Sequence, residues 1–339
     1  MTDMNAAQFP LLDVRNLSVA VPGRAGKINV VHDVSFKVDR NEALGIVGES
    51  GCGKSVSMLA ITGLLGRGAF VSGGSARFMG EELVGAAPAR LNALRGDRIA
   101  FIFQDPMAAF NPVIRIGEQV SEPLIYKKGL SRKDARTRAG ELFDMVGIPG
   151  AARRLDDYPH QFSGGMRQRA MIAMALACDP ELLIADEPTT ALDVTIQAQI
   201  AELVQQIALD TGMGLIWITH DLALISGLVD RISVFYAGRV VEEAETNALY
   251  QRPSHPYTQG LLASLPRLEG DRGGDLPSIP GTPPDPAAMP PGCAFAPRCP
   301  QVIQACNARI PPLHHVTTSS PHRVNCIQVS PEAEKAPVL

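Results

Sequence analysis

The segment that most constrains this chain is residues 48–55, whose letters GESGCGKS fit the spacing G-x-x-x-x-G-K-[ST] in full. An apolar run ends directly before it and a helical pattern begins directly after it, which is the context in which this spacing forms a phosphate-binding loop. Glycines let backbone N–H groups curl around an anion, and the following helix presents its positive end. We therefore predict a polyphosphate site; a glycine-rich turn that binds nothing is the weaker alternative.

The loop also predicts which atoms meet the phosphates. Lys54 has the length and charge to bridge the β- and γ-phosphates, and the Ser55 hydroxyl is a ligand for Mg²⁺. Cys52 is expected to contribute only its backbone, as a small filler rather than a redox sensor. The predicted phosphate-contacting residues are Gly48, Ser50, Gly51, Cys52, Gly53, Lys54, Ser55 and Val56.

Two carboxylates and a histidine follow later apolar runs. Asp186 and Glu187 come directly after the run at residues 182–185, and His220 closes the run at residues 215–219. Because ligands of open parallel sheets bind beyond such strand ends, we expect Asp186 to hold Mg²⁺ and Glu187 to polarise a water for attack on the γ-phosphorus. His220 is expected to reach the γ-phosphate. The alternatives are a solvated Asp-Glu-Pro turn and a structural histidine.

Apolar runs and helical repeats alternate along the chain, which predicts an α/β fold. Alternating polar and apolar letters over residues 11–38 indicate an antiparallel pair of strands. Short continuous apolar runs are typical of strands buried on both faces, and they cover residues 43–47, 99–103, 182–185 and 215–219. Helical patterns cover residues 132–146, 166–178 and 196–207, and a helical subdomain is expected at about residues 105–178.

Length and charge bound the class of protein. The 339 residues fit one large domain, predicted at 9–265, followed by an extension at 266–339. Thirty-one Lys and Arg against 35 Asp and Glu give a net charge of −4, which disfavours a nucleic-acid binder. No apolar run approaches the roughly 18 to 20 residues of a membrane span, so a membrane role is expected through a partner.

The extension contains four of the six cysteines, and its sequence is rich in proline and has no hydrophobic periodicity. Cys293, Cys299, Cys306 and Cys326 follow the spacing C-x5-C-x6-C-x19-C. Zinc sites favour closer cysteine pairs, and four thiolates at wider spacing suit an iron–sulfur cluster at least as well. Spacing leaves iron–sulfur, zinc and unligated thiols open.

Residues 158–169, YPHQFSGGMRQR, resemble the signature motif of ATP-binding-cassette (ABC) ATPases. Six motifs occur in the order of that family, and they include Gln104 of the Q-loop and Asp193 of the D-loop. The resemblance implies a mixed-sheet core with an antiparallel β subdomain, an inserted helical subdomain and an irregular extension. It also implies two ATP molecules held between paired ATPase domains, each facing the partner's signature, and Gln104 as a further Mg²⁺ ligand. The signature residues that would act in trans are Ser163, Gly164, Gly165 and Met166.

The detailed sequence also resembles that of the dipeptide, oligopeptide and nickel importers, in residues 103–112, 186–195 and 255–258. Met166, where the signature usually has Gln, resembles the D-type subunit of that group. Such subunits imply a second, non-identical ATPase chain, two transmembrane permeases, a solute-binding protein and a place on the cytoplasmic face of the bacterial inner membrane. The same group carries a [4Fe-4S] cluster in its extension, which favours iron–sulfur over Zn²⁺.

The sequence leaves one contact unassigned, and two other functions compete with the motor of an importer. The aromatic residue that stacks on adenine in the family would fall near Val21, so the adenine contact is unassigned. A soluble ABC ATPase of DNA repair or translation is the alternative function, although one cassette and an acidic balance speak against it. An adaptor that binds ATP without hydrolysis conflicts with the intact set of Lys54, Asp186, Glu187 and His220.

Overall fold

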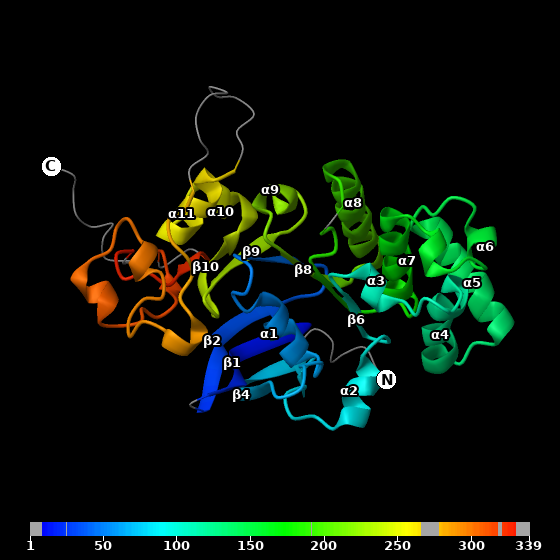
Figure 1. The fold of residues 1–339 in the computed structure, drawn as a ribbon, viewed down its shortest axis with the longest axis horizontal. Helices are drawn as coiled ribbons and strands as arrows, with labels where there is room; N and C mark the ends of the chain where they lie inside the picture. The colour runs from blue at the N-terminus through cyan, green and yellow to red at the C-terminus, as the bar shows by residue number, and fades with distance from the viewer. Residues whose placement is uncertain (1–8, 25, 191, 266–277, 318–320, 330–339) are drawn as a thin grey trace. The chain divides into compact units, whose positions relative to one another are not determined.

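The computed structural model describes residues 9–24, 26–190, 192–265, 278–317 and 321–329 (Figure 1). They form two compact units. Unit 1 takes in the described residues of Met1–Leu12, Lys37–Ala43 and Arg77–Ile218, and unit 2 those of Asp13–Phe36, Leu44–Ala76 and Thr219–Leu339. The boundary predicted between residues 265 and 266 falls at residues 266–277, outside the described residues, and stays a prediction.

Unit 1 contains a parallel sheet in the order β8-β7-β6. Every residue of β7 and β8 is buried. Because both faces of these strands are covered, their residues are apolar without alternation up to the strand end. The strands predicted at 99–103, 182–185 and 215–219 are confirmed to within one residue at each end. They are β6 (Ile99–Ile102), β7 (Leu182–Asp186) and β8 (Gly214–Thr219).

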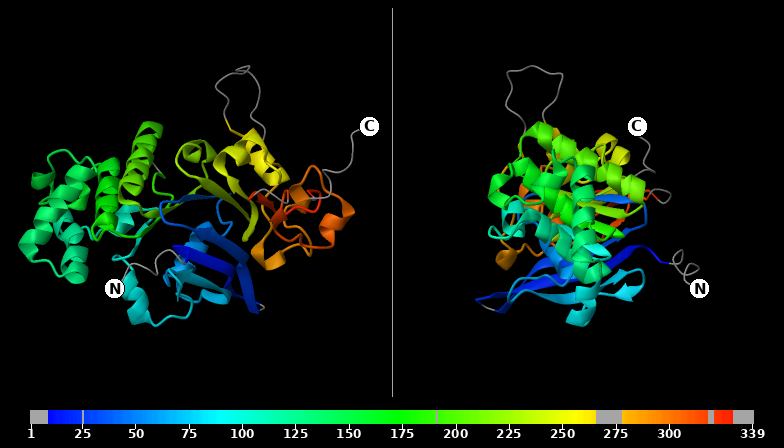
Figure 2. Two further views of the ribbon diagram at one scale, coloured as in Figure 1. Left: turned by 180° about the vertical axis from the view of Figure 1, so that it is seen from behind. Right: turned by 90° about the vertical axis from the view of Figure 1, so that its right-hand side faces the viewer.

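A group of helices lies between β6 and β7. Their apolar residues recur at helical spacing, so that α5 buries Ala135, Ala139, Leu142 and Phe143 on one face. Figures 1 and 2 show α4, α5 and α7 packed side by side in green. The inserted elements are α3 (Pro106–Ala109), α4 (Ile116–Lys128), α5 (Arg132–Met145), α6 (Ala151–Arg154), the 3₁₀ turn η1 (Pro159–Gln161) and α7 (Gly164–Leu176).

The other elements of unit 1 are short, apart from α8. Helix α8 begins after Asp193 and buries Ile200, Val204 and Ile207, as the repeat in the sequence predicts. The bounds are β5 (Glu81–Glu82), α2 (Pro88–Leu94) and α8 (Val194–Thr211). Strand β5 pairs antiparallel with Arg77 and Phe78.

Unit 2 contains the strand pair predicted over residues 11–38, now part of a sheet in the order β2-β1-β4. Its strands are β1 (Leu12–Gly23), β2 (Gly26–Val38) and β4 (Phe70–Phe78). A second sheet of unit 2 has the order β11-β12-β10-β9-β3, in which β3 runs parallel to β9 and the other pairs are antiparallel. This sheet is therefore mixed, as the family resemblance implies. Its inner strands are β3 (Ala43–Val47), β9 (Arg231–Tyr236) and β10 (Arg239–Glu245).

The extension is more ordered than its sequence predicts. Strand β12 (Arg323–Val324) pairs with β10 and β11 (His314–His315) pairs with β12, and Val324 lies fully buried opposite Glu242. Strands of two residues leave no periodic pattern, so sequence reasoning had no signal for them. The remaining turns are η2 (Pro286–Ala288), η3 (Ala296–Arg298) and η4 (Gln304–Asn307).

The helices of unit 2 are short. They are α1 (Lys54–Ile61), α9 (Leu222–Ile225), α10 (Thr246–Gln251) and α11 (Pro256–Ala263). Across the described ranges of the chain, no helix has the length and apolarity that crossing a membrane requires.

Candidate nucleotide site

The predicted phosphate loop connects β3 to α1 in unit 2, and its backbone requires its glycines. Gly48 has φ +154, and a Cβ added there would lie 2.2 Å from the Phe235 carbonyl oxygen. Gly53 has φ +97, and its Cβ would lie 3.1 Å from the Val30 oxygen. No side chain fits at Gly48 without moving the backbone of β9, so glycine at this position is fixed by close approach as well as by φ.

Lys54 lies inside the loop rather than in solvent. Its side chain is buried, and its Nζ donates to the carbonyl oxygens of Gly48 at 2.8 Å and Glu49 at 3.0 Å. A lysine needs such acceptors when it is buried, because an unpaired ammonium would be costly to desolvate. The loop thus holds its cation at the place where a phosphate oxygen would compete for it, at the N-terminal end of α1 where Ser55 and Val56 begin the helix.

Cys52 behaves as a packing residue. It is 5% exposed, and burial raises the pKa of its thiol. Its carbonyl oxygen accepts a hydrogen bond from the Gly238 N–H at 2.9 Å. Reactive cysteines are exposed and have lowered pKa values, so these observations support the filler role expected from the sequence.

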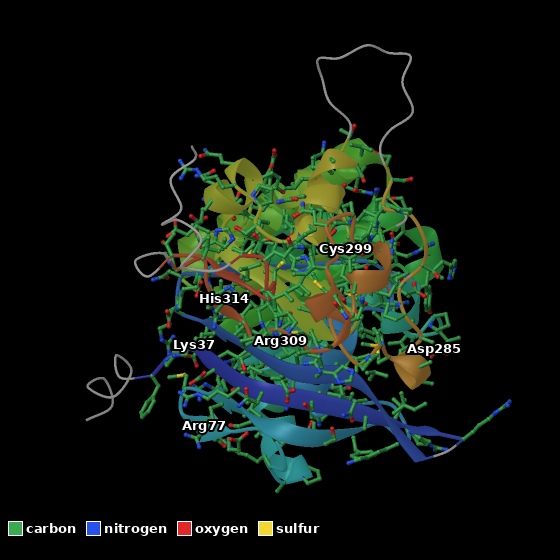
Figure 3. The ribbon with its side chains drawn as sticks, turned by 90° about the vertical axis from the view of Figure 1, so that its left-hand side faces the viewer. Lys37, Arg77, Asp285, Cys299, Arg309 and His314 are labelled. Atoms are coloured by element: carbon green, nitrogen blue, oxygen red, sulfur yellow. The ribbon has the colours of Figure 1, made fainter. Side chains whose placement is uncertain are left out.

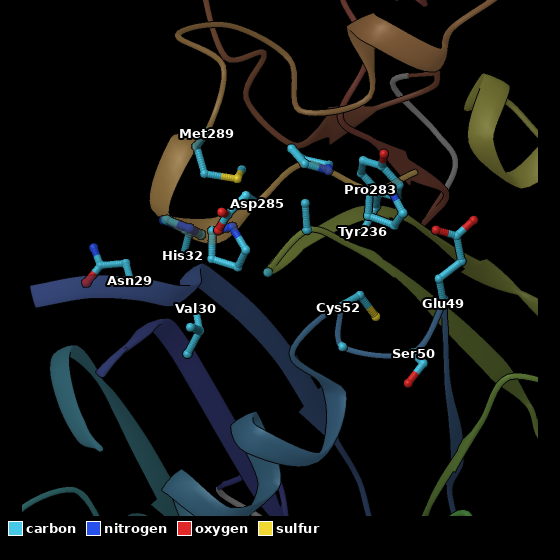
Figure 4. A pocket seen from close by; sticks show the side chains of 15 residues that line it. Asn29, Val30, His32, Glu49, Ser50, Cys52, Tyr236, Pro283, Asp285 and Met289 are labelled. Carbon is cyan, nitrogen blue, oxygen red and sulfur yellow. The ribbon is translucent and has the colours of Figure 1, made fainter. Parts of the chain in front are cut away.

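A cavity of about 310 Å³ adjoins the outer side of the loop in unit 2 (Figure 4). One wall is formed by Ser50, Gly51 and Cys52, and another by Asn29, Val30 and His32 of β2. The extension closes it with a proline-rich segment that includes Asp285 and Met289. The extension therefore reaches the immediate surroundings of the phosphate loop.

Gln104, Asp186 and Glu187 form a second group, in unit 1. The Gln104 side-chain amide donates to Glu187 Oε2 at 3.0 Å, and Asp186 is the last, buried residue of β7. Thr190, which sequence reasoning missed, donates its hydroxyl proton to the same carboxylate oxygen at 3.1 Å. The structure therefore gathers the predicted water-polarising and Mg²⁺-binding side chains of this unit at the ends of β6 and β7. His220 follows β8 and belongs to unit 2.

The signature residues lie at the start of α7. Ser163 caps this helix, since its Oγ accepts from the Met166 N–H at 3.3 Å. Ser163 and Gly164 are exposed, and Gly165 and Met166 are half-buried. The backbone N–H groups at the beginning of a thirteen-residue helix attract anions. Asp193 caps α8 in the same way, accepting from the Ile196 N–H at 3.0 Å.

The four cysteines of the extension come together. One cavity of about 20 Å³ is lined by Cys293, Cys299, Cys306 and Cys326, although the first and the last are 33 positions apart in the chain. Figure 3 labels Cys299 within this part of the extension. Burial raises the pKa of the Cys293 and Cys299 thiols, and the neighbouring cysteines raise it further. In the described part of the chain, however, no three His, Cys, Asp or Glu side chains have an arrangement that holds a metal ion.

Comparison with known proteins agrees with the fold. Residues 31–190 match the family described as ABC transporter, and residues 241–306 match the family described as oligopeptide/dipeptide transporter, C-terminal region. A Brucella melitensis protein, provisionally named a peptide import ATP-binding protein, is 47% identical over 331 residues, covering 94% of this chain and 97% of that protein. A second Brucella melitensis protein of the same name is 52% identical over 290 residues, covering 86% and 87%.

Solved structures of ABC cassettes have a similar fold. The dimeric post-hydrolysis state of an ATP-binding cassette bound to ADP and Pi aligns at a TM-score of 0.63 and 28% identity, covering 69% of this chain and 98% of that one. A Clostridium perfringens component of an ABC transporter complex aligns in fold at a TM-score of 0.61 and 24% identity, covering 72% and 91%. Neither set of relatives favours a role in DNA repair or translation. The chain belongs to the ABC transporter ATPases, in the group whose ATP-binding chains carry the oligopeptide/dipeptide transporter C-terminal region.

Proposed function

We propose that this chain is the ATP-hydrolysing motor subunit of an importer for peptides or a related solute. The observation that carries the proposal is the phosphate loop with its buried lysine, in a chain that is 47–52% identical to proteins named for peptide import over most of its length. ATP closes a pair of such subunits, and hydrolysis reopens it, which drives the permeases between two conformations.

Each predicted residue has a role in this proposal. Lys54 moves from its own loop carbonyls to the β- and γ-phosphates of ATP. The oxygens of Ser55, Asp186 and Gln104 are the hard donors that Mg²⁺ prefers, and the ion neutralises charge on the phosphates when bound. Glu187 polarises the attacking water. The backbone of residues 48–56 holds the phosphates, and His220 senses the γ-phosphate.

Two neighbouring side chains orient the Glu187 carboxylate for general-base catalysis. Gln104 and Thr190 both donate to the same oxygen, which fixes the rotamer of the carboxylate that is to accept a proton from water. A carboxylate oriented in this way loses little freedom when the water binds. The arrangement supports general-base catalysis in preference to binding alone.

The signature is proposed to act on the ATP of the neighbouring subunit. Ser163 and the N–H groups of Gly164 and Gly165 lie at an exposed helix start, which attracts a γ-phosphate presented by another chain. Met166 cannot donate a side-chain hydrogen bond there, which predicts unequal rates at two composite sites. Asp193 of the D-loop lies at the start of the next long helix.

The partners follow from the family. We propose a second, non-identical ATPase subunit and two transmembrane permeases, with a solute-binding protein that delivers the solute and no nucleic acid. The chain itself is assigned to the D type on Met166, and to the cytoplasmic face of the inner membrane. The match at residues 241–306 supports the peptide importers within the ABC family.

We further propose that the four cysteines of the extension bind a [4Fe-4S] cluster, with Zn²⁺ as the second candidate. The support is that all four cysteines line one cavity and that thiolates are the ligands of both groups, although the described side chains do not have a metal-holding arrangement. The cluster would order a segment that has few apolar residues to hold it in place. We propose a structural role for this cluster.

The first test concerns nucleotide binding. Lys54→Ala in the full chain should weaken ATP binding at least about 100-fold, because a buried charge contact to phosphate is lost. Binding is measured by titration with a fluorescent ATP analogue. Lys133→Ala, at an exposed lysine of α5, is the control and should leave affinity unchanged. Unchanged affinity in Lys54→Ala would refute the phosphate-loop assignment.

The second test concerns the cysteines. Anaerobically purified chain is analysed for iron, acid-labile sulfide and zinc, alongside Cys299→Ser and the control Cys178→Ser, a buried cysteine of unit 1. Iron and sulfide that disappear only in Cys299→Ser support the cluster. Zinc alone would replace it with the second candidate, and the absence of all three would reject both.

A further inference from the structure

The phosphate loop contains a carboxylate that should oppose its own ligand. Glu49 is the second residue of the loop, directly between Gly48 and Ser50, and its side chain is 25% exposed. A triphosphate brings several negative charges to this loop, and like charges a few ångströms apart repel strongly where water is partly excluded. The loop therefore needs a cation to compensate Glu49, in addition to Lys54.

Arg298 of the extension supplies that cation. Its Nη1 and Nη2 donate to the two carboxylate oxygens of Glu49, at 2.8 Å and 3.0 Å. The pair is bidentate, the geometry in which guanidinium binds carboxylate most strongly. The Arg298 side chain is only 5% exposed, and its bond to Glu49 raises the pKa of the guanidinium. Figure 4 shows the Glu49 side chain pointing away from that of Ser50.

The extension holds Arg298 in this direction. Its Nε donates to the Pro280 carbonyl oxygen at 2.9 Å, and its Nη2 to that of Ile279 at 3.3 Å. Its Nη1 also lies 3.3 Å from the Tyr236 hydroxyl of β9. Each of the three guanidinium nitrogens therefore has at least one acceptor in this orientation.

A second residue from later in the chain, Tyr257, binds the backbone of the loop. The Tyr257 hydroxyl of α11 accepts a hydrogen bond from the Glu49 backbone N–H at 3.0 Å. Tyr257 is fully buried and packs 4.6 Å from the Tyr236 ring. Both the backbone and the carboxylate of Glu49 are thus positioned by residues that lie more than 180 positions later in the sequence.

We propose that Arg298 is a positioning residue for ATP binding, which neutralises and orients Glu49 so that the phosphate loop accepts a triphosphate. The inference rests on the proposed function of the loop. The extension then completes the nucleotide site of its own chain, in addition to any contact with partners. Sequence reasoning missed this residue, because nothing along the chain indicates which of the arginines meets Glu49.

The same arginine joins the loop to the cysteines. Arg298 ends the turn η3, its N–H donates to the Phe295 carbonyl oxygen at 2.9 Å, and the next residue is Cys299. The Cys293 N–H is bonded to the Cys306 carbonyl oxygen at 2.7 Å, which closes this part of the extension on itself. The backbone that carries the guanidinium is therefore directly continuous with the segment that carries the cysteines.

The experiment uses charge removal in the full chain, copurified with its native partners, with KM for ATP and kcat measured for each variant. Arg298→Gln should raise KM about tenfold, close to 1.4 kcal/mol, with kcat at saturating ATP within about twofold of wild type. Glu49→Gln alone should raise KM less than Arg298→Gln does, because it removes the repelling charge together with the bidentate pair. The double variant, Glu49→Gln with Arg298→Gln, should return KM to within about twofold of wild type, because the uncompensated charge is gone.

Two further variants keep the test decisive. Arg298→Lys retains the charge and loses the bidentate contact, so it should raise KM about threefold, and Glu49→Gln should remove that increase. This pair replaces Arg298→Gln if that variant does not fold. Arg309→Gln, at an exposed arginine of the extension labelled in Figure 3, is the control and should match wild type.

The outcomes separate this inference from the proposed function. If Lys54→Ala loses ATP affinity while the Arg298 variants keep the wild-type KM, the inference fails and the function stands. If Glu49→Gln does not rescue either Arg298 variant, the arginine only stabilises the extension and the inference is again overturned. If Lys54→Ala retains affinity, the proposed function itself fails.

Discussion

At the residue scale, Glu187 combines an unusual backbone with a fixed side chain. Its φ is +46, in the left-handed region that residues with a Cβ rarely adopt. Its N–H is bonded to the Ile218 carbonyl oxygen at 3.0 Å, and Gln104 and Thr190 hold its carboxylate. Such strain costs of order 1 kcal/mol and persists where the surrounding structure fixes it, often at functional sites.

Glu187→Gln should keep ATP binding and lose turnover, because an amide cannot take a proton from water. General-base catalysis contributes about 10²- to 10⁴-fold, so phosphate release should fall by at least about 100-fold. Phosphate release and ATP affinity are measured on the same preparation. Glu202→Gln, at an exposed glutamate of α8, is the control. Wild-type turnover in Glu187→Gln would reject Glu187 as the base.

At the scale of elements, two helices of unit 1 begin with the same cap and differ in their first turns. Ser131 caps α5, with Oγ 3.2 Å from the Asp134 N–H, and Ser163 caps α7, 3.3 Å from the Met166 N–H. In α5 the first turn carries Asp134, which opposes an anion. In α7 the first two residues are glycines, which leave the N–H groups accessible to a phosphate.

This contrast predicts different effects for two matched substitutions. Ser131→Ala and Ser163→Ala should each lower the free energy of unfolding by about 1 kcal/mol, since each removes one cap. Only Ser163→Ala should also lower ATP hydrolysis, and only when the chain is assembled with its partners. Denaturant unfolding and phosphate release are compared for the two variants. Equal ATP hydrolysis by the two variants would show that the signature serine does not contribute to catalysis.

At the scale of the whole molecule, the phosphate loop belongs to unit 2, and the signature, Gln104 and Glu187 belong to unit 1. Residues 241–306, which include β10 residues and the first part of the extension, match a family region of their own, and the extension contributes β11, β12 and Arg298 to unit 2. It is therefore part of the structure around the phosphate loop rather than an appended tail. The exposed start of α7 is the feature on which the proposal of a second chain rests.

ATP should bring this chain and a second ATPase subunit together. Glu187→Gln with ATP and Mg²⁺ should form a stable pair with that subunit, because bridging phosphate is no longer removed. Without ATP, or in Lys54→Ala, the pair should separate. Size-exclusion chromatography with light scattering measures the masses. Full-rate hydrolysis by a strictly monomeric wild-type chain would contradict the composite site.

The sequence alone determined the strand pair over residues 11–38, the buried strands β3, β6, β7 and β8, and the local motifs, because these depend on short-range patterns. Continuous apolar letters fix β7 and β8, the G-x-x-x-x-G-K-S spacing fixes the loop, and Ser163 before Gly-Gly predicts a helix start. The change in composition beyond residue 265 predicted the extension, and the family resemblance added the mixed sheet.

Only the tertiary structure decided what meets the loop. The pairing of β12 with β10 buries Val324 without any periodic signal, and Arg298 meets Glu49 across 249 positions of chain. Thr190 likewise becomes a partner of Glu187 only once the turn after β7 is formed. Hydrogen bonds and ion pairs depend on distances of about 3 Å between atoms. Residues far apart in sequence reach such distances only through the packing of the whole fold.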